Sequence, residues 1–174
     1  WSFYEDSSVL FISSHQYPFY PGTGAADEIG AGDGVGFTIN WPLAAGATDA
    51  DYERVYAASA DVLRQFCPEM ILVSAGFDAH MDDPLGAMRV TTPQFGRLTG
   101  LISAVADDCC DGRMVVVTEG GYDLRAIAGS LRSVIEVMNS ASALDMLPPP
   151  VGPTPRADAV IAAARTHLGQ FWTI

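Results

Sequence analysis

Short apolar runs alternate along the chain with longer stretches in which apolar residues recur every three or four positions. Runs of the first kind are typical of strands in a buried parallel sheet. We expect three such strands, over 9–15, 70–77 and 114–121. Each is mostly apolar and closes on small or polar residues, so we also expect other elements to cover the sheet on both faces.

Stretches of the second kind predict amphipathic helices, because a period near 3.6 residues places the apolar side chains on one face. The first helix is expected over 49–66, with its N-cap within 48–49. The second is expected over 93–109, with a proline in its first turn, and the third over 124–138, behind an N-cap at Asp123. This alternation of strands and helices predicts an α/β fold with a parallel sheet.

The remaining segments are interpreted as a loop, a linker and a last helix. Residues 18–48 are rich in glycine and predict one long loop, and a loop of that length in a compact domain is usually functional. We divide the chain into a domain over 1–140, a proline-rich linker over 141–156 and a C-terminal helix within 157–174.

The balance of charges excludes some classes of partner. With 9 basic and 21 acidic side chains, the formal net charge is −12. Such a chain repels nucleic acid and anionic membrane surfaces, so we expect no nucleic-acid and no membrane partner. The same charge suits a cationic substrate, although solubility alone also accounts for it. No apolar run is long enough to span a bilayer, and the first residues lack the pattern of a signal peptide.

The 3 cysteines, Cys67, Cys109 and Cys110, form no CxxC pair. An odd number without that spacing argues against both a disulfide framework and a thiolate zinc site. We interpret these residues as structural thiols in a reducing compartment, and we expect a cytoplasmic location.

Several familiar nucleotide and nucleophile motifs are missing from the sequence. The glycines of 18–48 do not follow the G-x-G-x-x-G spacing of a dinucleotide site, and no phosphate-binding loop ends in GK[ST]. Leu72 stands where the first glycine of a hydrolase nucleophile elbow belongs, which argues against Ser74 as a nucleophile. The glycine-rich segment is therefore expected to allow tight turns rather than to hold phosphate.

Polar side chains follow each predicted strand, at the edge where open α/β sheets bind ligands. Asp78 follows the second strand, and an ionised carboxylate among apolar neighbours needs a cation or several hydrogen-bond donors. A metal ion meets that need, and capping of the following turn is the alternative. Tyr122 follows the third strand, where its phenol either stabilises charge on a substrate oxygen or packs under its loop. His15 ends the first strand, so all three ends predict one active site.

Three blocks of sequence together resemble a known family: "FYEDSSVLFISSHQYPFYPGTG", "SAGFDAHMDDPLG" and "EGGYDL". They resemble the second half of the zinc-dependent histone deacetylase and acetylpolyamine amidohydrolase family, and more narrowly its class II-like bacterial members. The resemblance runs from residue 1 to about residue 138. It implies the C-terminal part of an arginase/deacetylase fold, in which helices flank a parallel sheet. It also implies hydrolysis of an N-acetyl amide, such as an acetylated lysine or polyamine.

The resemblance assigns roles to the residues at the strand ends. Asp78, in "GFDA", matches one of three zinc ligands, and Tyr122, in "GGY", matches the residue that polarises the substrate carbonyl. Asp123 stands where the family commonly has Asn, a change that affects the hydrogen bonding or charge of this loop.

Further residues match the substrate tunnel and two structural cation sites, so the expected cofactors are Zn²⁺ and also K⁺. Tyr20, in "FYPGTG", and Leu85, in "DPLG", match walls of the acyl-lysine tunnel, and Gly120 and Gly121 match positions that contact substrate. The residues that match potassium ligands are Ser13 by its hydroxyl, Ser14 by its carbonyl, and the carbonyls of Phe3, Asp6, Val9 and Phe37.

The family's other two zinc ligands, in an Asp-x-His-His-Gly segment, and its catalytic His-His pair have no match in this sequence. His15, His80 and His167 do not match those positions, and we interpret His80 as a surface or packing residue. We therefore expect the chain to be a fragment that is inactive alone. The alternatives are a non-catalytic, degenerate deacetylase-like binding module and an arginase-like ureohydrolase, which the lack of Asp-rich two-metal motifs disfavours.

Overall fold

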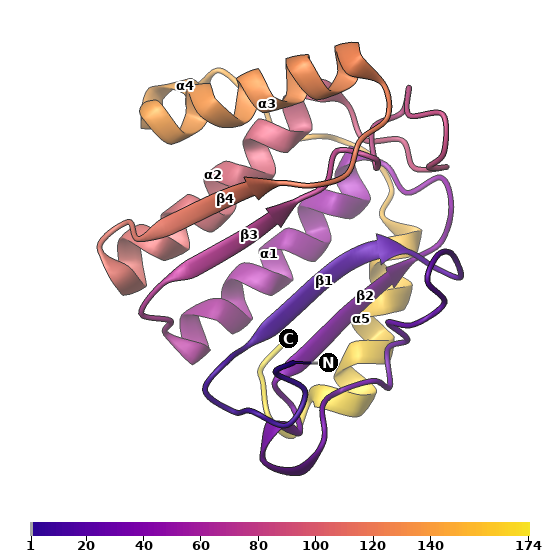
Figure 1. The fold of residues 1–174 in the computed structure, drawn as a ribbon, viewed down its shortest axis with the longest axis vertical. Helices are drawn as coiled ribbons and strands as arrows, with labels where there is room; N and C mark the ends of the chain where they lie inside the picture. Colours follow the sequence, from indigo (N-terminus) through magenta and orange to yellow (C-terminus); the bar gives the residue numbers. More distant parts are fainter. Residues whose placement is uncertain (1) are drawn as a thin grey trace.

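The computed structural model describes residues 2–174, which form strands and helices in alternation (Figure 1). The strands run in parallel within each hydrogen-bonded pair, and helices flank them. The α/β fold expected from the sequence is therefore confirmed. The elements are β1 (Phe11–Gln16), a 3₁₀ turn η1 (Gly32–Gly34), β2 (Thr38–Leu43), α1 (Asp49–Phe66), β3 (Ile71–Ala75), α2 (Thr92–Cys110), β4 (Met114–Thr118), α3 (Leu124–Asn139), α4 (Ala141–Asp145) and α5 (Pro155–Leu168).

The strands form two separate parallel pairs. β1 pairs with β2, from Phe11 opposite Thr38 to Gln16 opposite Leu43. β3 pairs with β4, with Ile71 opposite Met114 at the first position of the register. In Figure 1 all four strands point the same way, and the free edges of β1 and β3 face each other. All four carboxyl ends therefore lie at the same edge of the molecule.

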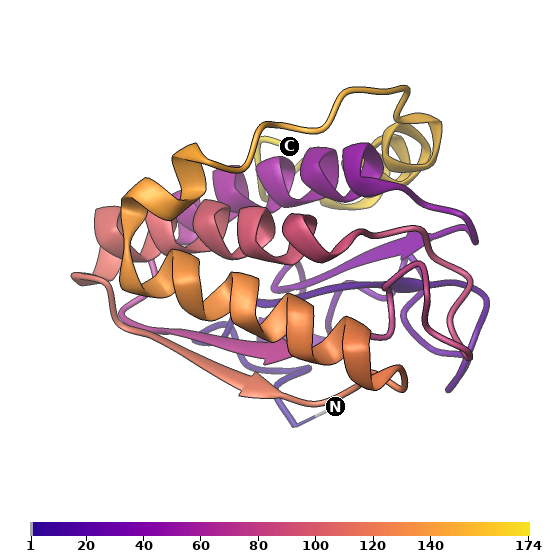
Figure 2. The same cartoon turned by 90° about the horizontal axis from the view of Figure 1, so that it is seen from above.

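Helices cover one face of the strands, and side chains on the other face of β3 and β4 are exposed. Figure 2 shows α1, α2 and α5 on one side of the strand layer. On the β3–β4 pair, Leu72 is 72% exposed and Val117 is 54% exposed. The expectation that the sheet is covered on both faces is therefore wrong for these two strands, because no element within residues 2–174 packs over those side chains.

Strand β2 lies inside the segment that the sequence predicted as one long loop, so that prediction is wrong for Thr38–Leu43. The strand is almost completely buried, and Ile39, Trp41 and Leu43 are each 0% exposed. The Trp41 indole Nε1 donates a hydrogen bond to Ser59 Oγ on α1, at 2.9 Å. The apolar residues at alternate positions were the signal of a strand, but the glycines before it and the proline within it masked that signal.

The three long helices confirm their predicted bounds to within a residue at each end, and α1 covers the predicted 49–66. Thr48 and Asp51 form a capping box at the start of α1. Asp51 is 0% exposed, and its Oδ1 also accepts hydrogen bonds from the backbone N–H groups of Arg156 (3.1 Å) and Ala157 (3.0 Å). One buried carboxylate therefore joins the first turns of α1 and α5.

The segment after α3 contains one short helix, α4, and residues 146–154 form no helix or strand. Helix α5 begins at Pro155 and places Ala157, Ala164 and Leu168, all 0% exposed, in the main core. Within residues 2–174, none of the helices has the length and apolar character required to cross a membrane.

Because α5 contributes to the core, truncating it is expected to destabilise the whole domain. Leu168→Ala is expected to lower the free energy of unfolding by about 2–5 kcal/mol, as for other buried leucines. Val151→Ala is the matched control, since Val151 is 100% exposed, and its effect is expected to stay within about 0.5 kcal/mol. Urea denaturation of the 174-residue chain measures both values. Equal effects of the two substitutions contradict the assignment of α5 to the core.

Candidate active site

The segment that joins β3 to α2, residues 76–91, contacts the chain beyond the ends of the other strands, and we call it the rim loop. The backbone N–H of Ala87 donates to Gln16 Oε1, at the end of β1, at 2.8 Å. The N–H of Gly46, beyond the end of β2, donates to the Ala87 carbonyl at 2.7 Å. The rim loop is therefore anchored to the carboxyl ends of β1 and β2 at one point.

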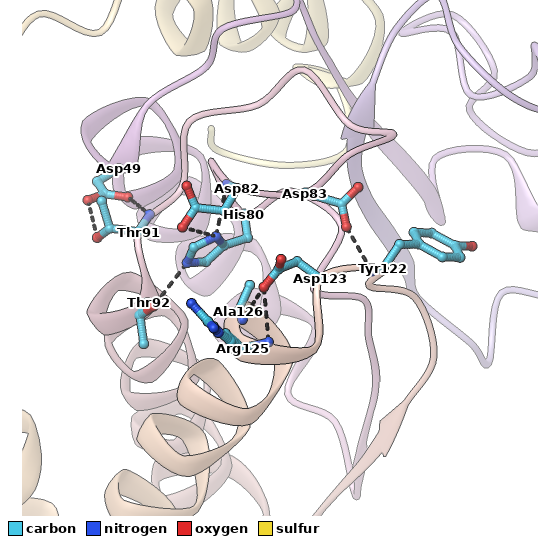
Figure 3. Close-up of polar contacts among 10 residues, drawn as sticks. All are labelled: Asp49, His80, Asp82, Asp83, Thr91, Thr92, Tyr122, Asp123, Arg125 and Ala126. Atoms are coloured by element: carbon cyan, nitrogen blue, oxygen red, sulfur yellow. Dashed lines mark hydrogen bonds and ion pairs between the residues drawn. The ribbon is translucent and has the colours of Figure 1, made fainter.

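The end of β4 reaches the rim loop through Asp83 and Tyr122 (Figure 3). The backbone N–H of Tyr122 donates to Asp83 Oδ2 at 2.8 Å. The Phe77 N–H donates to the Gly120 carbonyl, also at 2.8 Å. The carboxyl ends of all four strands thus meet around the rim loop, as the sequence predicted for the strand ends that it recognised.

Buried and half-buried polar side chains fix the shape of the rim loop. His80 is 4% exposed; its Nε2 lies 2.9 Å from Thr92 Oγ1, and its Nδ1 accepts the Asp82 N–H at 3.1 Å. Asp49 accepts hydrogen bonds from both the N–H and the hydroxyl of Thr91, each at 2.7 Å (Figure 3). The imidazole of His80 therefore packs inside the loop with both nitrogens partnered, which agrees with its interpretation as a packing residue.

The Asp78 carboxylate lies against two glycines that leave space for it. A β-carbon at Gly120 would lie 3.0 Å from Asp78 Oδ2, and one at Gly76 would lie 3.1 Å from Oδ1. Both distances are tighter than ordinary van der Waals contact, so a larger residue at either position would press on the carboxylate. The glycines in "SAGFDA" and in "EGGY" therefore both leave room for the Asp78 carboxylate, which packs against them.

The electrostatic surroundings of Asp78 favour a cation. Partial burial raises the pKa of the Asp78 carboxyl, and the nearby Asp83 carboxylate raises it further, against a hydrogen bond with its own backbone. Among residues 2–174, no basic side chain forms an ion pair with Asp78. A carboxylate in such surroundings fits the role of a metal ligand. In the part of the chain that the structure describes, no cluster of three or more potential ligands surrounds it.

Tyr122 lies on a turn made by two glycines, between β4 and α3. Gly121 has a φ of +128°, a conformation that side chains disfavour, and a β-carbon there would lie 2.8 Å from Ile127 Cγ1. The Tyr122 side chain is 58% exposed and points away from the rim-loop side chains (Figure 3). Asp123 accepts the N–H groups of Arg125 (2.9 Å) and Ala126 (2.8 Å), which confirms it as the N-cap of α3.

The two residues predicted to line a substrate tunnel are both exposed. Tyr20, shortly after the end of β1, is 90% exposed, and Leu85, in the rim loop, is 58% exposed. Both apolar side chains are accessible to a ligand at the edge where Asp78 and Tyr122 lie. Their roles as tunnel walls stay predictions, as do those of Gly120 and Gly121.

The two predicted potassium sites lie on and around β1. The Ser13 hydroxyl lies 3.0 Å from His15 Nδ1, and Ser14 forms a hydrogen bond with Tyr56, whose pKa burial raises. The Phe3 and Asp6 carbonyls each accept a backbone N–H three residues later, at 3.2 and 3.5 Å. The remaining predicted ligands are the carbonyl of Val9 and that of Phe37, which accepts the N–H of Phe11 at 2.9 Å. A carbonyl oxygen has two lone pairs, so these bonds leave a second one for a cation, and the sites stay predictions.

Burial and hydrogen bonds define the surroundings of His15, beside the predicted potassium site. Its Nε2 lies 3.0 Å from the Gly24 carbonyl, and with Ser13 at Nδ1 both ring nitrogens are partnered. Burial lowers the pKa of His15, although the Gly24 carbonyl and the Glu28 charge oppose that effect. These contacts suit a structural role for His15.

Sequence reasoning missed two residues that organise the site, Gln16 and Asp83. Gln16 bonds to the rim loop across 71 positions of sequence, and Asp83 bonds to Tyr122 across 39 positions. No local pattern marks either contact, although Asp83 precedes a proline in "DDPLG", where a carboxylate commonly begins a turn.

Comparison with known proteins places this geometry in a family. Residues 1–138 match the histone deacetylase domain. The chain is 40% identical to histone deacetylase 15 of Arabidopsis thaliana over 98% of its own length and 31% of that protein. It is 43% identical to a probable deacetylase of Archaeoglobus fulgidus over 70% of its length and 34% of that protein. The crystal structure of the HDA15 HD domain superposes with a TM-score of 0.85 at 35% identity, covering 98% of this chain and 46% of that one.

Parallel strands flanked by helices, with the polar residues gathered at the strand carboxyl ends, define part of a deacetylase-type α/β domain. The structure of the histone deacetylase Clr3 agrees, with a TM-score of 0.83 at 34% identity over 98% of this chain and 29% of that one. The chain belongs to the histone deacetylase family. It spans about a third of the length of the curated relatives described above.

The raised pKa of Asp78 predicts that its charge destabilises the metal-free fold. The folded state binds this proton more tightly than the unfolded state, so stability is lost as pH rises from the unfolded pKa through the folded one. Asp78→Asn removes the charge, and the metal-free variant is expected to melt at a higher temperature than the original chain at pH 7. Below about pH 4, where the unfolded carboxyl also takes up its proton, the gain is expected to vanish.

Scanning calorimetry of the 174-residue chain in EDTA, at both pH values, measures this difference. Asp82→Asn is the matched control, because it removes an equal charge from an exposed side chain of the same loop. A lower melting temperature for Asp78→Asn than for the original chain at pH 7 would rule out this account of the carboxylate.

Proposed function

We propose that this chain forms the C-terminal part of a zinc-dependent amidohydrolase that removes acetyl groups from acetyl-lysine or acetylpolyamine-type substrates. The observation that carries the proposal is the fit of the Asp78 carboxylate against Gly120, two residues before Tyr122. Asp78 and Tyr122, which follow two different strands, thereby lie at one edge, as the proposed metal ligand and the proposed phenol donor require. Membership of the histone deacetylase family supports the same reading.

Asp78 is the residue of this chain that would hold zinc. When bound, zinc acts as a Lewis acid on the acetyl carbonyl and lowers the pKa of a water molecule. The raised pKa of the Asp78 carboxyl and the lack of an ion pair with a basic side chain within residues 2–174 fit this role. Asp78 offers one oxygen ligand with one negative charge, and further ligands are required to complete the zinc site.

Tyr122 acts on the substrate oxygen in this proposal. Its phenol donates a hydrogen bond to the carbonyl oxygen as negative charge develops there, which stabilises the transition state more than the ground state. The exposed side chains of Leu85 and Tyr20 flank the acyl chain and exclude water from it. The net charge of −12 favours a cationic amine or a peptide that carries one.

The remaining zinc ligands and the catalytic histidines are proposed to come from outside these 174 residues. Within residues 2–174, β1 and β3 each have one edge that pairs with no strand, and these edges face each other in Figure 1. A parallel strand that paired with both would end at the edge where Asp78 lies. It would also pair the backbone N–H and C=O groups that these two edges leave unpaired within residues 2–174, which supports the proposal that the 174 residues alone are inactive.

Tyr122→Phe is expected to lower kcat for an acetyl-lysine peptide about 10²–10³-fold in the full-length protein that contains these residues, because it removes one donor to the oxyanion. KM is expected to change little, since the donor acts mainly in the transition state. Steady-state kinetics with zinc present provides both values. Phe keeps the ring, so circular dichroism is expected to match that of the unchanged protein.

Two results would contradict the proposal. Unchanged kcat in Tyr122→Phe, in a protein that does hydrolyse the peptide, removes the phenol from the mechanism. Absence of hydrolysis in the full-length protein, with zinc bound, favours a non-catalytic binding module instead.

A further inference from the structure

Asp83 is a buried carboxylate whose charge is satisfied by backbone N–H groups. It is 7% exposed, and no basic side chain within residues 2–174 pairs with it. Its Oδ1 accepts the N–H groups of Leu85 at 2.9 Å and Gly86 at 3.0 Å, and its Oδ2 accepts that of Tyr122 at 2.8 Å. Three donors compensate the cost of burying the charge.

These three bonds join two parts of the rim that are distant in sequence. Two of the donors belong to the turn that begins at Asp83 itself, and that turn presents Leu85 to solvent. The third donor belongs to the turn after β4 that presents Tyr122. One carboxylate therefore sets the separation between the side chain proposed to line the substrate and the side chain proposed to polarise it.

We propose that Asp83 is a positioning residue, which fixes the phenol of Tyr122 relative to the wall residue Leu85 by accepting the Tyr122 N–H. The catalytic consequence of this inference rests on the proposed function. The hydrogen bond between Asp83 and the Tyr122 N–H does not depend on that function. The turn that Asp83 holds contains Gly120 and Gly121, and Gly121 has a φ of +128°. Two adjacent glycines leave the backbone many alternatives, so an anchor at the next N–H limits where the phenol can lie.

The contacts predict what an amide does at this position. Within residues 2–174, the hydrogen bonds to the two oxygens of Asp83 come from backbone N–H donors, whereas an asparagine has one oxygen and one NH₂ group. Oδ1 receives two bonds and Oδ2 receives one, so the amide oxygen is expected to replace Oδ1. The NH₂ group then faces the Tyr122 N–H, donor against donor. Asp83→Asn therefore releases Tyr122 while the turn at Leu85 persists.

Asp82→Asn is the matched control, since Asp82 is the neighbouring residue with the same chemistry. Its side chain is 68% exposed and lies 3.8 Å from His80 Nδ1, whereas the Tyr122 N–H is bonded to Asp83. The substitution removes an equal charge from the same loop and leaves the anchor in place. A difference between the two variants therefore reports the hydrogen bond and not the net charge.

The first test measures hydrogen exchange of individual amides in the 174-residue chain by NMR. In Asp83→Asn, the Tyr122 amide is expected to exchange about 10–100-fold faster, as for the loss of a hydrogen bond to a charged group. The Ile39 amide in the core is expected to be unchanged, as are all these rates in Asp82→Asn. An unchanged rate for Tyr122 in Asp83→Asn overturns the proposal.

A second measurement needs no substitution and holds even if Asp83→Asn does not fold. In the unchanged chain, a scalar coupling across the hydrogen bond is expected between the Tyr122 amide nitrogen and the Asp83 carboxylate carbon. Its detection supports the anchor. A Tyr122 amide that shows no such coupling and exchanges at the rate of an unprotected amide contradicts it.

The catalytic consequence is tested by a double-mutant cycle in the full-length protein with zinc and an acetyl-lysine peptide. Asp83→Asn is expected to lower kcat about 10–100-fold with KM changed less than about threefold, because a misplaced phenol weakens transition-state stabilisation. In the Tyr122→Phe background the same substitution is expected to have no further effect, since the group that it positions is gone. Equal losses in both backgrounds indicate a merely structural residue and overturn the positioning role. A Tyr122→Phe variant with unchanged kcat instead overturns the proposed function. In that case the hydrogen-exchange rate of the Tyr122 amide alone decides whether Asp83 anchors this turn.

Discussion

The parallel direction of the strands is the constraint on which the site depends. Parallel strands end at one edge, so the chain must leave β1, β2, β3 and β4 at the same place. The rim loop uses that meeting point, because its backbone and side chains bond to the last residue of β1 and to the segments that follow β2 and β4. Asp78 and Tyr122 are brought together by this topology and not by closeness in sequence.

The site is built at a cost to the stability of the metal-free fold. Glycines at positions 76, 120 and 121 provide the space and the turn, but they forgo the side chains that would stiffen the backbone. Two carboxylates, Asp78 and Asp83, lie close enough for their charges to repel each other. Backbone donors satisfy Asp83, whereas burial and the Asp83 charge raise the pKa of Asp78, which suits its proposed role as a metal ligand.

Much of the fold followed from local patterns in the sequence. The helix over 49–66 and the N-cap at Asp123 were predicted because periodicity and capping chemistry are local properties. Strand β2 was missed because its alternating apolar residues lie in a glycine-rich segment. The coverage of β3 was predicted wrongly, because a run such as "ILVSA" records that a strand suits burial, and not which element covers it.

The candidate site was likewise predictable only where a local pattern in the sequence marks a residue. Asp78 and Tyr122 were predicted as site residues because each closely follows an apolar run, and strand ends are where such residues act. The role of Asp83 depends on an N–H 39 positions away, which no window of sequence reveals. His80 lies two residues after Asp78 in "FDAH" and has the side chain of a possible metal ligand. Its two ring nitrogens are instead hydrogen-bonded, one to Thr92 Oγ1 and the other to the backbone N–H of Asp82.

The central claim is that Asp78 is a metal ligand at the meeting point of the strand ends. X-ray diffraction from crystals of the full-length protein, recorded on both sides of the zinc absorption edge, tests it most directly. The account predicts an anomalous peak about 2.0–2.2 Å from a carboxylate oxygen of Asp78. A fully occupied zinc ion elsewhere in the protein, with none beside Asp78, would contradict it.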